Sequence, residues 1–122
     1  MKKLSLILVL VILFSPVTYL HGQSDNEKVI GLIKEFKFKI LSRGDMRGNG
    51  LGLNILVSPS ISKPRALEIT EKIRASFPGK ILDVAIYDSE TAYKNKYNDK
   101  YPESKYFRHY LVQMNVNPNT GF

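Results

Sequence analysis

Tyrosines and lysines alternate along residues 87–110, and these are the side chains in the sequence best suited to contact a ligand. Tyrosine rings stack on bases or sugar rings, while lysines neutralise phosphates and other anions. The pattern therefore predicts a surface for a glycan, a nucleic acid or a protein. The structural alternative is that the rings cover a sheet and the lysines form a solvated face. The candidate contact residues are Tyr93, Lys94, Tyr97, Lys100, Tyr101, Arg108 and His109.

A second candidate is the tripeptide Arg43-Gly44-Asp45, which integrin-type receptors read on cell-adhesion proteins. It lies in SRGDMRGNG, residues 42–50, where several glycines permit positive φ and the Asp and Asn suit turns. Turn chemistry thus explains most of the stretch, and we expect residues 43–50 to form the tip of a hairpin. Adhesion through this exposed loop is the remaining functional interpretation.

The side chains needed for catalysis are sparse. His109 is the only histidine besides His21, no G-x-S-x-G elbow surrounds a serine, and the absence of cysteine excludes thiol chemistry. Zinc needs three or four ligands that this chain does not offer, and its carboxylates show no EF-hand spacing. We expect no catalytic residue, no metal and no cofactor. A small carboxylate-dependent hydrolase of the cell envelope is the alternative, because two acids can meet in space.

The N-terminus has the layout of a secretory signal peptide: Lys2 and Lys3 precede an apolar run that Pro16 interrupts. The run is shorter than the roughly 20 residues that a spanning helix needs. We expect residues 1–22 to be the signal peptide and residues 23–122 to be one domain, exported to the periplasm or secreted. An uncleaved N-terminal segment that anchors the protein in the membrane is the alternative.

The charge of the exported part limits its partners. Removing Lys2 and Lys3 from the 18 basic side chains leaves 16 against 11 acidic ones, a net charge of +5. Such an excess favours anionic partners, but it is spread along the chain and also serves solubility. Export argues against nucleic acid as a target. We therefore expect a protein or glycan of the envelope or exterior as the partner, and a membrane only if the leader stays attached.

The apolar spacing gives the order of the elements. Residues 34–42 and 51–57 alternate at period two and predict strands, whereas residues 25–33 suit either a short helix or an extension of the first strand. Ser62, Pro64 and the Pro78-Gly79 stop delimit a helix with one apolar face.

The second half of the chain continues this pattern. Residues 81–88 predict a central strand, and a shorter helix should run from Asp88 or Ser89 to about Asn98, with tyrosines four apart along one side. In the last strand we expect one face to carry Tyr110, Val112, Met114 and Val116. The order β-β-α-β-α-β predicts an α+β two-layer sandwich. Its sheet should be mainly antiparallel, with about four strands and helices on one face.

The segments VSPSISKPRALEITEKIR and YLVQMNVNPNTG stand within this outline. Together they give the chain the look of small exported bacterial domains of unknown function, which it resembles over roughly residues 36–121. The resemblance implies an α+β fold and a bacterial, exported protein. It carries no catalytic residue across.

Overall fold

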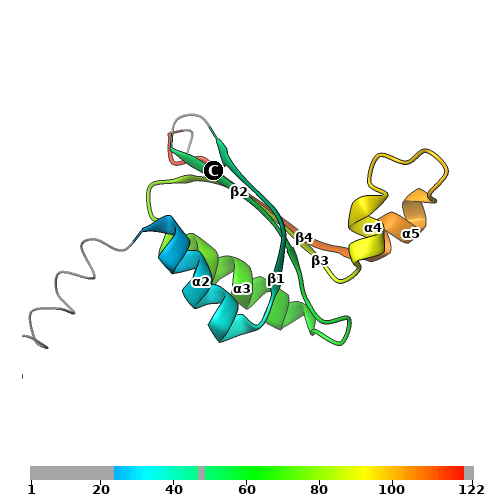
Figure 1. The fold of residues 1–122 in the computed structure, drawn as a ribbon, viewed down its shortest axis with the longest axis horizontal. Helices are drawn as coiled ribbons and strands as arrows, with labels where there is room; N and C mark the ends of the chain where they lie inside the picture. Colours follow the sequence, from blue (N-terminus) through cyan, green and yellow to red (C-terminus); the bar gives the residue numbers. More distant parts are fainter. Residues whose placement is uncertain (1–23, 47–48, 120–122) are drawn as a thin grey trace, which may run out of the picture. The chain divides into compact units, whose positions relative to one another are not determined.

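The computed structural model describes residues 24–46 and 49–119 (Figure 1). Residues 1–30 and 31–122 form two compact units, and the predicted signal peptide, residues 1–22, lies outside the described residues. Of the first unit, the structure describes residues 24–30, which open helix α2, Asp25–Phe36. Ser24 caps this helix, since its Oγ accepts a hydrogen bond from the backbone N–H of Glu27 at 3.2 Å.

Helix α2 decides the alternative that the sequence left open for residues 25–33, in favour of helix. The predicted strand over 34–42 is wrong at its start, because the helix continues to Phe36 and strand β1 begins only at Lys39. Leu32 and Phe36 are buried at helical spacing, so burial favours the period of 3.6 here. Lys37, at φ 60°, ends the helix.

One mixed sheet carries the second unit, in the order β1-β2-β3-β4. Strand β1, Lys39–Met46, is antiparallel to β2, Gly50–Leu56, and β3, Ile81–Tyr87, is antiparallel to β4, Tyr110–Val116. Strands β2 and β3 run parallel, joined through helix α3, Lys63–Ser76. The predicted α+β fold with a four-stranded sheet is confirmed.

Helix α3 begins and ends where the sequence predicts. Ser62 Oγ accepts from the backbone N–H of Arg65 at 3.2 Å, Pro64 lies in the first turn, and Gly79 adopts φ 77° after the helix. The helix lies along one face of the sheet (Figure 1). The core between them comes from alternate residues of β2 and β3 and one helix face: Leu51, Leu53, Ile55, Leu82, Val84, Ile86, Ala66, Ile69 and Ile73.

The predicted helix over 88–98 is wrong in length. Helix α4, Glu90–Lys94, stops early, and a separate helix α5, Glu103–Arg108, follows Pro102. Asn95 explains the stop, because its Nδ2 donates to the Thr91 carbonyl at 2.8 Å and competes with the helix backbone. The tyrosines at 93, 97 and 101 therefore do not share one side of a helix. Helices α4 and α5 lie where β3 ends and β4 begins (Figure 1).

Both edge strands carry a β-bulge near this end of the sheet. The register shifts between Ile40 and Ser42 in β1, and at Leu111 in β4, where Ile86 pairs with Val112 but Tyr87 pairs with Tyr110. An extra residue turns the following side chain to the other face. The prediction that Tyr110 faces the same way as Val112 is therefore wrong. Tyr110 instead shares the face opposite α3.

Candidate ligand-binding site

The bulges bring a set of tyrosines together on the sheet face opposite α3. Tyr87, 2% exposed, is their centre: its ring centroid lies 5.3 Å from that of Tyr93, 6.0 Å from Tyr106 and 5.1 Å from Tyr110. Its hydroxyl is 2.7 Å from the hydroxyl of Tyr106. Burial raises the pKa of Tyr87, and the same cause raises the pKa of Tyr110. These rings hold α4 and α5 on the sheet.

Tyr93, a predicted contact residue, belongs to this structural set. Its hydroxyl donates to Ser42 Oγ at 2.7 Å, and Asn54 Nδ2 donates to the same oxygen at 2.8 Å. The bond links α4 to β1 and β2 across the sheet. The Tyr93 ring is only half-buried, but its hydrogen bond to Ser42 gives it a structural role.

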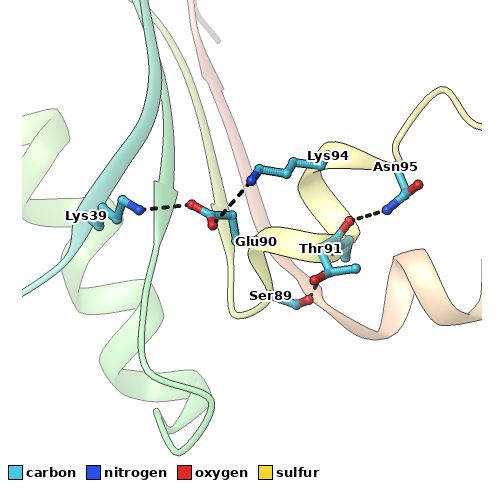
Figure 2. A network of polar contacts seen from close by, with 7 residues as sticks. Lys39, Ser89, Glu90, Thr91, Lys94 and Asn95 are labelled. Atoms are coloured by element: carbon cyan, nitrogen blue, oxygen red, sulfur yellow. Dashed lines mark hydrogen bonds and ion pairs between the residues drawn. The ribbon is translucent and has the colours of Figure 1, made fainter.

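Lys94, also predicted to contact a ligand, takes part in an ion-pair network that joins α4 to β1. Figure 2 shows Glu90 between Lys39 and Lys94, with Nζ–Oε distances of 2.9 Å and 3.6 Å. The hydrogen bond from Lys39, followed by the positive charges of Lys39 and Lys94, lowers the pKa of Glu90. Ser89 caps the same short helix through the Ala92 N–H.

His109 closes the connection between β3 and β4. Its Nδ1 lies 2.7 Å from Asp88 Oδ1, and its carbonyl accepts the backbone N–H of Asp88 at 3.1 Å. The two residues stand at the two ends of the connection, residues 88–109. Both contacts therefore clamp these ends together. They give His109 a structural role in the connection.

A pocket of about 370 Å³ opens between the segment that follows α4, residues 95–101, and helix α5. It brings together two predicted residues, Tyr97 and Tyr101, while Lys100 and Arg108 are exposed and are not among its lining residues. The pocket is lined by Asn95, Lys96, Tyr97, Asn98, Asp99, Tyr101, Glu103, Tyr106 and Phe107.

Two aromatic side chains of the pocket remain open to water: Tyr97 is 89% exposed and Phe107 is 63% exposed. Phe107 and Lys96 lie within the tyrosine- and lysine-rich stretch 87–110 but were not among the candidate contact residues. Pro102, the N-cap of α5, was the signal that could have placed Glu103, Tyr106 and Phe107 on one short helix. The ring centroids of Tyr106 and Phe107 lie 5.2 Å apart.

Lysines stand over the rings of this region. Lys96 Nζ lies 4.5 Å from the ring centroid of Tyr93 and 5.2 Å from that of Tyr97, and Lys105 Nζ lies 5.4 Å from that of Tyr101. Such cation–π contacts hold the rings in place while the ammonium groups stay in water. Positive charge therefore borders the aromatic walls, while Asp99 and Glu103 supply acceptors.

The Arg43-Gly44-Asp45 tripeptide is not at a hairpin tip. It lies within β1, with Gly44 in register with Gly52 of β2, so the predicted loop over 43–50 is wrong as far as Met46. Arg47 and Gly48 lie outside the described residues. The turn is nevertheless signalled by Asn49, which adopts φ 68°. The pairing of the leucine-rich β2 sequence extends β1 further than the glycines suggested.

Neither the predicted lack of a metal nor that of a catalytic group is decided by the structure. Among the described residues no cluster of three or more His, Asp or Glu side chains suits a metal ion. Asp99 and Glu103 both line the pocket, and both are exposed. A second cavity of about 530 Å³ lies at the end of α3, and Glu71 is the acidic residue among those that line it.

Comparison with protein-family models, with curated proteins and with solved structures gives no significant match for this chain. Over the part of the chain that the structure describes, no helix combines the length and the apolarity that crossing a bilayer requires.

Proposed function

We propose that this protein is an exported, non-catalytic binding domain that contacts its ligand through the pocket between residues 95–101 and α5. The observation that carries the proposal is the contrast between tyrosines of one short stretch. Tyr87 and Tyr93 are committed to the fold, whereas Tyr97 points its ring into water at the rim of a pocket. An exposed ring beside a cavity, with a second one at Phe107, is a surface suited to a partner.

A glycan of the envelope or exterior is the ligand class that fits this pocket. Aromatic walls offer flat apolar faces to sugar rings, and a few polar groups then fix orientation. Asp99 and Glu103 can accept hydrogen bonds from sugar hydroxyls, and Lys96 can donate to an acidic substituent. A volume of about 370 Å³ is near the lower end of ligand pockets, so one or two sugar units fill it.

Export itself is supported by the sequence of residues 1–22, a short basic start followed by an apolar run. It places the domain where envelope polysaccharides and secreted glycans occur. Nucleic acid does not occur there as a regular partner, and a pocket of about 370 Å³ suits one or two sugar units better than the broad surface of a protein.

Binding of purified envelope glycans and their oligosaccharides, measured by calorimetry, tests the proposal. Stacking on one aromatic ring is worth about 1–3 kcal/mol, so Tyr97→Ala and Phe107→Ala should each weaken binding roughly 5- to 150-fold. Leu67→Ala, which removes an exposed apolar side chain from α3, away from the pocket, is the control and should leave affinity unchanged. Failure of the wild-type protein to bind any glycan, or equal affinity in Tyr97→Ala, would contradict the proposal.

Hydrolysis is the second candidate, because Asp99 and Glu103 line the same pocket. Glycosidases use two carboxyl groups about 5–10 Å apart. Incubation of the same glycans with wild type and with Asp99→Asn should show no release of reducing ends if the domain only binds. Turnover that disappears in Asp99→Asn and in Glu103→Gln would establish the hydrolase instead.

A further inference from the structure

Strand β1 is an edge strand: among the described residues, its strand partner in the sheet is β2. It stands first in the order β1-β2-β3-β4, and after the bulge at Leu41 it pairs regularly with β2 from Ser42 to Met46. The outer edge of such a strand presents N–H and C=O groups that can pair with another strand. Figure 1 shows β1 with β2 on one side as its strand neighbour in the sheet.

The charges on this edge are arranged symmetrically about Gly44. Arg43 and Asp45 flank it and lie on the same face, since both alternate with Gly44. When two copies pair antiparallel about a two-fold axis through Gly44, Arg43 of each copy lies directly opposite Asp45 of the other. Pairing centred on Arg43 or on Asp45 would instead place like charges opposite each other. The sequence therefore selects one register.

We propose that a second copy of this chain pairs with β1 in this register, which makes the sheet continuous across two molecules. Within one chain, Arg43 Nη2 and Asp45 Oδ1 are 3.9 Å apart, the outer limit of an ion pair. Residues two apart on a strand are separated by about 6.6–6.8 Å along it, whereas directly opposed residues have Cβ atoms about 4.5–5.5 Å apart. The Cβ atoms of Arg43 and Asp45 across the two copies would thus lie closer together than those along one strand.

Gly44 lies at the proposed two-fold axis. A Cβ at this position would meet nothing within 4 Å, and the backbone does not adopt a positive φ here. Neither crowding nor backbone geometry inside the chain demands glycine. At the two-fold axis, glycine leaves the sheet face opposite Arg43 and Asp45 clear of side chains where the two copies would meet. The side chain of Asp45 is 80% exposed and that of Arg43 is 28% exposed, so the carboxylate is the more accessible member of the pair.

Sedimentation of the protein purified after expression of the full chain tests this inference. The wild type should show a monomer–dimer equilibrium as concentration rises. Asp45→Arg alone opposes Arg to Arg twice, and Arg43→Asp alone opposes Asp to Asp twice, so each should lower the association constant at least tenfold. An equimolar mixture of the two variants restores both opposite-charge pairs and should form a mixed dimer.

Lys72→Asp makes the same change of charge on exposed α3 as Arg43→Asp makes on β1, and it should associate like wild type. Circular dichroism verifies that each variant keeps the fold. A wild type that stays monomeric at every concentration, or folded single variants that associate as strongly as wild type, would overturn the proposal. A mixture of folded variants that fails to associate would overturn the proposed register.

Discussion

Replacing Tyr87 separates the contribution of its ring from that of its hydroxyl. Tyr87→Phe removes one hydroxyl–hydroxyl hydrogen bond of 2.7 Å, worth about 1 kcal/mol of unfolding free energy. The partner hydroxyl, on half-buried Tyr106, can turn to water, which keeps the loss small. Tyr87→Ala also removes a ring in contact with three tyrosines, and truncation of a buried aromatic ring costs about 3–5 kcal/mol.

Urea unfolding followed by circular dichroism measures the two losses of unfolding free energy, and thermal unfolding measures the corresponding falls in Tm. A domain of this size loses about 4–8 °C of Tm per kcal/mol, so the Phe variant should melt roughly 5 °C lower and the Ala variant at least 12 °C lower. Tyr106→Phe combined with Tyr87→Phe should cost little more than either change alone, because both remove the same bond. Exposed Tyr97→Ala is the control and should stay within about 0.5 kcal/mol of wild type. A Tyr87→Ala variant that loses less than about 1 kcal/mol would refute the assignment of this ring as the anchor of α4 and α5.

The remaining predictions concern backbone, cap and pH. Gly79→Ala should lower the free energy of unfolding by about 1–2 kcal/mol in chemical unfolding, because Gly79 has φ 77°. Gly31→Ala, inside α2 with open space around its Cβ, should raise it by about 0.5–1 kcal/mol. Equal effects of the two changes would refute the reasoning. Ser62→Ala should cost about 1 kcal/mol through loss of the α3 cap, and Asp at this position should retain it. Burial raises the pKa of Tyr87 and Tyr110, so the unfolded chain loses these protons first and the free energy of unfolding should fall as pH rises above about 10. Absorbance at 295 nm follows the ionisation, and an unfolding free energy that rises with pH in this range would contradict it.

The sequence predicts those elements whose signals are local. Helix α3 has a capping serine, a proline in its first turn and a glycine after its end, so its position follows from residues next to each other. Strand β2 follows from the alternation of its apolar residues, and strand β3 follows from its valine and isoleucine content. The start of β1 was misplaced because Phe36 and Phe38 are both buried, the first on a helix and the second just before the strand. Over so short a stretch, the apolar residues fit the spacing of a strand (period two) as well as that of a helix (period 3.6).

The site could be predicted only in composition. Residues 87–110 do contain the pocket, and Tyr97 and Tyr101 line it. Which tyrosine faces water depends on the bulge at Leu111 and on the helix stop at Asn95, and neither is visible as an apolar pattern. The same applies to His109, whose partner Asp88 lies at the far end of the connection. Contacts between residues that are distant in sequence decide these positions.

The clamp between Asp88 and His109 gives the connection from β3 to β4 a modular character. Its two ends are held together by a backbone and a side-chain contact, and β3 and β4 pair directly beyond them. A short turn could therefore replace residues 89–108 without moving the ends of either strand. Exchange of this segment would leave the pairing of β3 with β4 in place, but it would remove the packing of Tyr93 and Tyr106 on Tyr87 and therefore lower the free energy of unfolding.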